Sequence, residues 1–234
     1  MEFILSRLID FIDQYYHQKI ILKKLKELKL EIIFDIGAHK GEFSKSVLNI
    51  KKTKKIYAFE PQKEIFNEYS KILNKNQKIK YINFALSDVS GKRRIQINKK
   101  TSTSTFSKIN INSNWFKIKN LLLGSYNKSS FLKNEYVKTS TGDKFIKLFK
   151  LKYIDLLKID TEGHEYSVLK GFKKSFKKNS IKSILIEIHN NEMFKQYNIK
   201  TIENFLKKNN FIFKGKFKFP FLTFEDRLYI NNKY

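Results

Sequence analysis

The sequence predicts an α/β fold built on a doubly wound, mostly parallel sheet. From residue 31 onward, short runs rich in β-branched and aromatic residues alternate with runs whose apolar residues have helical spacing. The short runs are apolar almost throughout, which is typical of parallel strands covered on both faces. The chain has 234 residues and is 41% hydrophobic, so it can bury the core of one globular domain.

The N-terminal segment, residues 1–30, precedes this alternation. Its apolar residues, such as Leu8 and Leu25, recur at helical spacing and predict one or two amphipathic helices. The basic stretch at 19–29 is expected to be the solvated face of a helix packed on the domain, and peripheral contact with a membrane surface is the alternative. We therefore divide the chain into an N-terminal helical segment and one domain at 31–234.

The elements of the domain follow in order along the chain. Strands are expected at 31–37, 54–60, 78–86, 153–160, 180–189, 211–217 and 227–231. Helices are expected at 41–50, from Ile65 to Leu73, in the stretch closed by Gly171, and from Ile202 to Leu206.

Residues 99–134 interrupt this alternation. They contain the run TSTSTF, with Thr103 and Ser104, and the single tryptophan of the chain, Trp115. A connection of this length in a compact domain is usually functional or disordered. Hydroxyl groups together with an indole face suit a sugar, so the segment is predicted to be a substrate lid; an ordinary polar loop is the alternative.

The composition excludes several classes of protein. The absence of cysteine rules out a disulfide framework, a thiolate zinc site and a cysteine nucleophile. No apolar run reaches the roughly 18 residues of a membrane span. Glu2, Asp10 and Asp13 stand where a signal peptide would be basic. We therefore expect a cytoplasmic protein without a transmembrane segment.

The net charge of +26 raises the question of a nucleic-acid partner. Only four of the 48 basic residues are arginine, the residue that bidentate recognition of phosphate and guanine prefers. The lysines are spread over nearly every segment. We expect no specific nucleic-acid partner, although such a surface attracts anionic molecules in general.

The first strand ends in the motif DIGAHKGEFS, residues 35–44. Asp35 is followed by Gly37, Gly41 and a helix, a pattern typical of a turn whose backbone approaches a ligand closely and whose amides face an anionic group. It is not the G-x-G-x-x-G of a dinucleotide fold, because His39 stands at the second glycine position and would crowd a pyrophosphate. A smaller group, such as an amino-acid carboxylate, fits better.

Two further acidic residues follow strands. Glu60 ends the second strand, where an acidic side chain in such folds accepts both hydroxyls of an adenosine ribose. Asp88, in the motif ALSD at 85–88, is placed to accept from an adenine amino group, unless it lies in a solvent-exposed turn before Gly91. Together with the glycine turn, these residues predict an adenosine-containing ligand with little or no phosphate.

A third group of ionisable residues lies in LKIDTEGHEYSVLKG, residues 157–171. An apolar strand ends at Asp160 and a helix begins near Gly163, so Glu162 and His164 reach the carboxyl edge of the sheet, where ligands bind in open α/β folds. Acidic residues also favour helix N-termini. A carboxylate that ends a buried strand is costly without a partner, which favours a functional interpretation of Asp160.

The motif ILIEIH, residues 184–189, reaches the same edge. Its Glu187 and His189 share one face of a strand, because side chains alternate with a period of two. A general base, a pair of metal ligands and a structural hydrogen-bonded pair all remain open for these two residues.

The motifs DIGAHKGEFS, FEP, ALSD, LKIDTEGHEYSVLKG and ILIEIH, in this order and spacing, resemble the FkbM family of S-adenosylmethionine-dependent methyltransferases. The resemblance covers residues 31–231, and KIDTEGHE followed by VLKG is its most specific part. It implies a Rossmann-like class I methyltransferase fold, with a seven-stranded sheet, one antiparallel strand and helices on both faces. The chain departs from the family in having His39 where asparagine is commoner.

The resemblance also implies S-adenosyl-L-methionine as methyl donor and a small-molecule or glycan acceptor. For this chain we expect O-methylation of a hydroxyl group of a sugar, a glycolipid, a polysaccharide or a related metabolite. The residues expected to bind the cofactor are Asp35, Gly37, Ala38, His39, Gly41, Ser44, Glu60, Pro61, Ser87, Asp88 and Asp160. The residues expected to bind the acceptor are Thr103, Ser104, Trp115 and Glu162.

Methyl transfer requires alignment and a base rather than a nucleophilic side chain. We expect His164 or His189 to take the proton of the acceptor hydroxyl, with a slight preference for His189. Asp160 and Glu187 are the other expected catalytic residues. A site without metal is favoured; the alternative is a divalent metal held by Asp160, Glu187 and His189 that lowers the hydroxyl pKa.

Two other functions remain open. A nicotinamide-dependent oxidoreductase would share the fold, although His39 and the missing G-x-G-x-x-G disfavour it. A non-catalytic basic module that binds glycans or nucleic acids is the second, and the complete set of cofactor positions argues against it.

Overall fold

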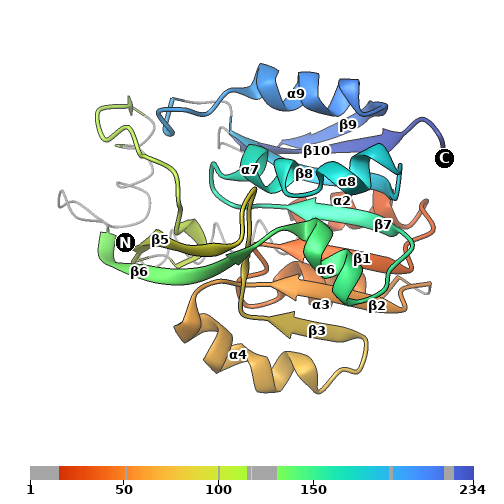
Figure 1. Cartoon of the computed structure of the whole chain (residues 1–234), viewed down its shortest axis with the longest axis horizontal. Coiled ribbons are helices and arrows are strands. Elements are labelled where there is room, and N and C mark those ends of the chain that lie inside the picture. The colour runs from red at the N-terminus through yellow and green to blue at the C-terminus, as the bar shows by residue number, and fades with distance from the viewer. Residues whose placement is uncertain are drawn as a thin grey trace.

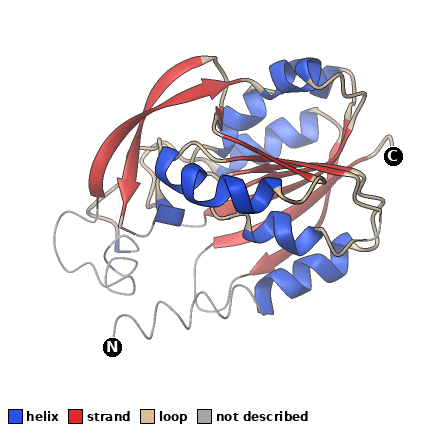
Figure 2. Cartoon of the chain, turned by 90° about the horizontal axis from the view of Figure 1, so that it is seen from below, coloured by secondary structure: helices blue, strands red, loops and turns tan. Residues whose placement is uncertain are grey.

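The computed structural model describes residues 16–50, 52–99, 101–114, 117, 131–189, 192–218 and 224–234. The described residues form a seven-stranded sheet with the order β3-β2-β1-β7-β8-β10-β9 and a three-stranded sheet with the order β4-β6-β5. Helices cover both faces of the larger sheet (Figure 1 and Figure 2). The fold is thus the α/β fold that the sequence predicts.

The larger sheet consists of β1 (Ile32–Ile36), β2 (Lys55–Phe59), β3 (Ile79–Ile82), β7 (Ile154–Ile159), β8 (Ile181–His189), β9 (Phe211–Lys218) and β10 (Phe224–Asn231). The pairs β1–β2, β2–β3, β1–β7 and β7–β8 are parallel. Strand β10 is antiparallel to both of its neighbours, β8 and β9. The expected seven-stranded sheet with one antiparallel strand is confirmed.

The helices are α2 (Gln18–Leu25), α3 (Glu42–Val47), α4 (Lys63–Asn74), α6 (Gly142–Leu148), α7 (Glu165–Lys170), α8 (Lys173–Lys177) and α9 (Ile199–Lys208). Helix α2 buries Ile21 and Leu25 in a core cluster, as its amphipathic spacing predicts. The rest of the predicted N-terminal helical segment, residues 1–15, lies outside the described residues. None of the helices in the described part of the chain has the length and apolarity needed to span a membrane.

The core lies on both faces of the larger sheet, which explains why its central strands are apolar throughout. Successive residues of a strand point to opposite faces. In β1, Phe34 and Ile36 join one buried cluster and Ile33 joins the other. The sequence of a strand covered on both faces therefore shows a continuous apolar run instead of an alternation.

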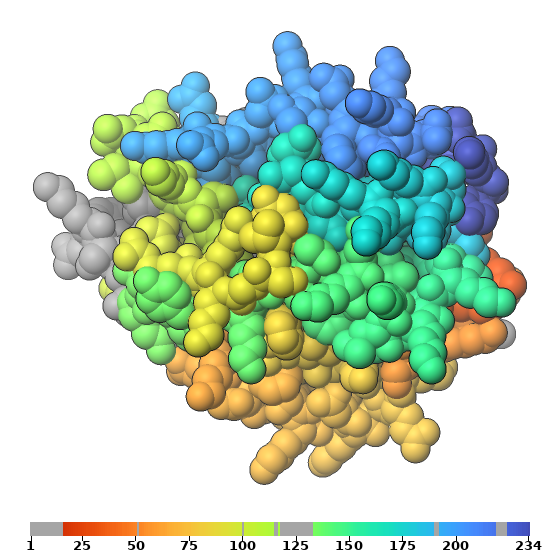
Figure 3. Space-filling view, viewed as in Figure 1, coloured from red at the N-terminus to blue at the C-terminus, as the bar shows by residue number. Residues whose placement is uncertain are grey.

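The second sheet was not predicted from the sequence. It consists of β4 (Ala85–Leu86), β5 (Gly91–Asn98) and β6 (Phe131–Ser140). Strand β6 pairs with β5 in antiparallel and with β4 in parallel orientation. This sheet lies beyond the carboxyl ends of the parallel strands, on the left of Figure 1, and in the space-filling view it borders α7 (Figure 3). The alternation of Ile95 and Ile97 with polar residues was the signal for β5.

Two expected boundaries are wrong because of this second sheet. The strand expected at 78–86 ends at Ile82, since the side-chain amide of Asn83 donates to the carbonyls of Glu60 (2.9 Å) and Pro61 (3.0 Å) and the chain turns away. Residues 131–134, expected in the lid, belong to β6.

Candidate active site

The turn between β1 and α3 packs directly on the end of β7. Gly37 has a φ of +79°, and a Cβ atom there would lie 1.7 Å from the carbonyl oxygen of Asp160. Only glycine fits this position. The amides of Gly37 and Ala38 donate to the carbonyl of Phe59, at 3.1 and 3.0 Å. These amides bind the protein itself, which corrects the expectation that they face an anionic ligand.

Glu60 follows β2 and is 2% exposed. Its carboxylate oxygens accept from the amides of His39 (3.0 Å) and Gln62 (2.7 Å). Burial raises the pKa of Glu60 to about 7, against the effect of these hydrogen bonds. Each carboxylate oxygen can accept a second hydrogen bond, so Glu60 can still bind hydroxyl groups of a ligand.

Lys158 joins two of the predicted site residues and was not itself predicted. Its ammonium group lies 2.9 Å from Asp160 Oδ2 and 3.7 Å from Asp35 Oδ1. Asp35 is fully buried and also accepts from the Ser44 hydroxyl at 2.6 Å. Burial disfavours the charge of Asp160, but the attraction of Lys158 lowers its pKa overall. A lone lysine in the apolar run LLKI was the signal for this buried ion pair.

A cavity that is partly open to solvent lies at the carboxyl edge of the larger sheet. It is lined by Ile36, Gly37, His39, Phe59, Glu60, Pro61, Gln62, Phe84, Ala85, Leu86, Ile95, Ser102, Ser104, Phe106, Asp160, Thr161, Glu162 and His164. The edge is the one predicted from the sequence, and the lining combines apolar walls with a few polar groups.

His164 lines this cavity and is 7% exposed. Burial lowers its pKa to about 4, and the positive charge of Arg93 adds to this effect. Its Nε2 lies 3.0 Å from the Ser87 hydroxyl, which donates to Asp88 Oδ1 at 2.9 Å. Since the Ser87 proton is used by Asp88, Nε2 carries the imidazole proton and donates to Ser87.

Asp88 lies outside the cavity lining. Its carboxylate contacts Arg93 at 3.0 Å and Lys170 at 3.1 Å. Because the two cations hold this side chain, the structure gives no support to the expectation that Asp88 binds an adenine amino group.

The segment 101–107 closes one side of the cavity. The Thr101 carbonyl accepts from the side-chain amide of Gln62, and the Ser104 hydroxyl donates to the same amide group. Further along, the hydroxyls of Thr105 and Ser107 donate to the carbonyls of residues 162 and 163. Ser104 lines the cavity, whereas Thr103 is bonded to Asn98. Trp115 lies outside the described residues.

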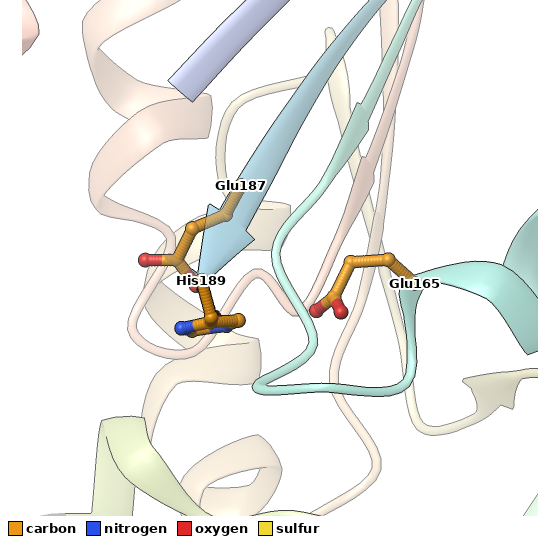
Figure 4. A group of neighbouring side chains, drawn as sticks. All are labelled: Glu165, Glu187 and His189. Carbon is orange, nitrogen blue, oxygen red and sulfur yellow. Dashed lines mark ion pairs between the residues drawn. The ribbon is translucent and has the colours of Figure 1, made fainter. Parts of the chain in front are cut away.

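Glu187 and His189 do not line the cavity. They end β8 and lie beside Glu165, the first residue of α7 (Figure 4). The ring of His189 contacts Phe194 and Tyr197, with centroid distances of 4.9 and 5.5 Å. The structure thus separates the two predicted histidines and leaves His164, not His189, in the cavity.

The set of possible metal ligands also differs from the predicted alternative. Asp160 is paired with Lys158 and also makes a side-chain hydrogen bond to Glu187, so it remains next to this pair. The group whose ligand atoms converge consists of Glu165, Glu187 and His189. Glu165 was not predicted to be a functional residue, because an acidic residue in the first turn of a helix is common.

The predicted residues therefore divide into two groups. Those that line the cavity are Gly37, His39, Glu60, Pro61, Ser104, Asp160, Glu162 and His164. Those that the structure places outside its lining are Asp35, Ala38, Gly41, Ser44, Ser87, Asp88, Thr103, Glu187 and His189. Gln62 was missed because it belongs to no motif, whereas Ser102 and Phe106 lie in the run TSTSTF and were not singled out within it.

Comparison with known proteins identifies the family. A sequence model of the methyltransferase FkbM domain matches residues 35–213. A crystal structure of methyltransferase FkbM from Methylobacillus flagellatus KT is similar, with a TM-score of 0.55 and 14% identity over 86% of this chain and 44% of that chain. TrmK from M. capricolum, in complex with S-adenosyl-homocysteine, has a TM-score of 0.50 and 15% identity over 91% of this chain and 68% of that chain. No curated protein matches the chain.

A SAM-dependent methyltransferase from Aquifex aeolicus is similar over nearly the full length of both chains, 99% and 98%, with 11% identity and a TM-score of 0.50. At such identities the structures establish the class I methyltransferase fold alone. This chain spans less than half of the Methylobacillus chain. The sequence model, in contrast, covers most of this chain and includes both the β1 turn and the β8 motif. The chain belongs to the FkbM methyltransferase family.

Proposed function

We propose that this protein transfers a methyl group from S-adenosylmethionine to a hydroxyl group of a sugar or of a molecule that contains one. The observation that carries the proposal is that Glu60 and His164 line the same cavity. Glu60 supplies a carboxylate for the ribose hydroxyls of the donor, and His164 supplies a base for the acceptor.

The cavity suits this donor. It holds a buried carboxylate at the end of β2, and apolar side chains such as Phe59 and Phe84 lie around it. An adenosyl group presents an apolar ring and two ribose hydroxyls, which match this lining. The cavity does not contain the glycine-rich backbone that a pyrophosphate requires, which favours this donor over a nicotinamide cofactor.

When bound, the donor supplies a methyl group on positively charged sulfur, which needs no further activation. The protein must hold the acceptor oxygen in line with that group and receive its proton. Because Nε2 of His164 donates its proton to the Ser87 hydroxyl, Nδ1 is the ring nitrogen that can accept a proton. As the acceptor oxygen takes the methyl group, its proton passes to Nδ1. With a pKa of about 4, His164 is neutral at pH 7, so its Nδ1 lone pair is free of a proton.

The acceptor class is inferred from the segment 101–107. Its Ser102 and Ser104 line the cavity next to Phe106, which combines hydroxyl groups with an aromatic face. Such a lining suits a polyhydroxylated ring, which offers both hydrogen-bond partners and an apolar face.

Calorimetry with S-adenosylmethionine tests the donor. We expect the wild type to bind, and Glu60→Ala to weaken binding by about 1.5 to 3 kcal/mol, the cost of removing a charged hydrogen-bond acceptor. Glu64→Ala, which removes an exposed glutamate of α4, is the matched control and should bind normally. Failure of the wild type to bind, or equal binding of NADH, would reject the proposed donor.

Transfer of a labelled methyl group to sugar-containing acceptors tests the base. We expect His164→Gln to lower kcat by roughly 10²- to 10⁴-fold while donor affinity stays nearly unchanged, the usual effect of losing a general base. Methylation at nitrogen or carbon, or full activity of His164→Gln, would contradict this assignment.

A further inference from the structure

We propose that Glu165, Glu187 and His189 bind a divalent transition-metal cation, with Zn²⁺ as the ion that fits best. One carboxylate oxygen of each glutamate and one ring nitrogen of the histidine lie within 4.8 Å of one another. Two of the residues come from the end of β8 and the third from the start of α7 (Figure 4). The site lies outside the lining of the cavity described above.

The polar atoms of this cluster lack the partners that buried groups normally have. Oε2 of Glu165 is buried and makes no hydrogen bond to any described residue. Oε2 of Glu187 and Nε2 of His189 are buried as well and lie 3.1 Å apart, without the geometry of a hydrogen bond. Glu165 is 0% and His189 is 3% exposed. Buried polar atoms without a well-formed hydrogen bond are rare in folded proteins, and the convergence of these atoms on one point favours a bound group.

The charge of the cluster calls for a cation. His189 Nε2 lies 3.1 Å from Glu187 Oε2, but an imidazole is charged only when protonated. In the described part of the chain no ion pair joins a lysine or arginine to Glu165 or Glu187, and the ammonium of Lys158 lies between Asp35 and Asp160. A divalent ion would neutralise both carboxylates and coordinate the neutral imidazole.

The ligand types select the ion. Two carboxylates and an imidazole form a mixed oxygen and nitrogen set of the kind that Zn²⁺ accepts, with a water molecule as fourth ligand. Tetrahedral bonds of about 2.1 Å separate ligand atoms by about 3.4 Å, so the side chains must move together slightly on binding. Mg²⁺ prefers six oxygen ligands and retains its water, which suits this buried site less well.

The ion would connect the end of β8 to the loop that lines the cavity. Oε1 of Glu165 accepts from the amides of Thr161 (3.1 Å) and Gly163 (3.0 Å). A metal on its other oxygen would hold this carboxylate in place, and with it the loop that contains Glu162. The proposed ion therefore positions the loop and is separate from the methyl-transfer step.

Metal titration of the full chain tests the site. After chelator treatment, the protein is titrated with Co²⁺, whose visible spectrum reports imidazole and carboxylate ligands, and then with Zn²⁺ and Mg²⁺ in competition. We expect one Co²⁺ per chain, displaced by Zn²⁺ and not by Mg²⁺. Hydrogen exchange of the Thr161 and Gly163 amides should slow when the ion binds, because the metal fixes their acceptor.

Isosteric variants locate the ion. Glu187→Gln and His189→Gln should weaken binding by at least about 100-fold, since losing an outer partner alone costs about 10- to 100-fold. Glu60→Gln, which changes a buried carboxylate at the same edge of the sheet, should bind like the wild type.

A wild-type chain that binds neither Co²⁺ nor Zn²⁺ would overturn the proposal. The proposal would also be overturned if Glu187→Gln and His189→Gln both bound the metal as tightly as the wild type, because the ion would then lie elsewhere. Circular dichroism must show that at least one of the two variants is folded. No methyl donor is present in these measurements, so their outcome is independent of the proposed methyl-transfer function.

Discussion

At the scale of single residues, burial acts in opposite directions on the two cavity side chains that carry the proposed function. It raises the pKa of Glu60 to about 7, because a buried carboxylate resists ionisation. It lowers the pKa of His164 to about 4, because a buried imidazole resists protonation. Burial thus favours the neutral form of both side chains, while Glu60, with a pKa of about 7, is still partly ionised at pH 7.

The His164 shift makes a prediction about stability. Its pKa is about 4 in the folded protein and 6.5 when unfolded, so the unfolded chain binds more protons between these values. The His164 contribution to stability is present above pH 6.5 and is lost as the pH falls toward 4, by about 3 kcal/mol. Relative to the wild type, His164→Gln should lose less stability on acidification, as urea denaturation at pH 7 and pH 4.5 would show. If the difference in unfolding free energy between the two proteins were the same at pH 7 and pH 4.5, the lowered pKa of His164 would be contradicted.

Glu60 predicts the opposite slope. Its pKa of about 7 lies above the ordinary value of 4.5, so the folded protein binds more protons between these values. The contribution is present below pH 4.5 and is lost as the pH rises through 7. Glu60→Gln should therefore gain stability relative to the wild type as the pH is raised from 4.5 to 8, by about 3 kcal/mol in the limit. Urea denaturation of both proteins at pH 4.5 and pH 8 measures this difference in stability. If Glu60→Gln instead gained stability relative to the wild type on acidification, the raised pKa of Glu60 would be refuted.

At the scale of elements, the turn after β1 joins three neighbouring strands. Gly37 lies against the Asp160 carbonyl after β7, and the Gly37 amide donates to the Phe59 carbonyl at the end of β2. Backbone contacts alone thus connect the ends of these three strands at the carboxyl edge of the sheet. This rigid base keeps Glu60 and Asp160 at fixed separation across the cavity.

Gly37→Ala should consequently destabilise the fold strongly. The new Cβ would collide with backbone at 1.7 Å, and a φ of +79° is unfavourable for alanine. We expect a loss of about 3 kcal/mol or more, measured by urea denaturation. Gly215→Ala is the control, because a Cβ there meets no atom within 4 Å, and its effect should stay below about 1 kcal/mol. Similar losses in the two variants would show that the turn is not the constrained point.

At the scale of the whole molecule, the net charge of +26 governs non-specific association. The excess comes from lysines on many segments, among them the exposed Lys29 and Lys54, rather than from one arginine-rich surface. Long-range attraction to polyanions is expected, and it is screened by salt because the charges are in solvent.

This distribution predicts salt-sensitive binding to nucleic acid without sequence preference. Affinity for duplexes of different sequence should be equal at low salt and fall linearly with salt on a logarithmic scale. Fluorescence anisotropy over a salt series measures both properties. Binding that prefers one sequence and persists at high salt would contradict the expectation of no specific nucleic-acid partner.

Much of this protein could be inferred from local sequence pattern. The apolar runs of the central strands and the helical spacing of α4 and α9 are properties of neighbouring residues, so they appear directly in the sequence. Because parallel strands end at one edge, motifs that follow strands had to converge, which placed Glu60, Asp160 and His164 around one cavity.

The tertiary structure alone decided which partner each buried charge has. Lys158 lies between Asp35 and Asp160, and Glu165, which the sequence did not single out, joins Glu187 and His189. The second sheet likewise depends on the pairing of β5 with β6, which are separated by more than thirty residues. Hydrophobic periodicity is a local property of the chain, whereas the partner of a buried charge and the pairing of an isolated strand depend on distant residues that only folding brings together.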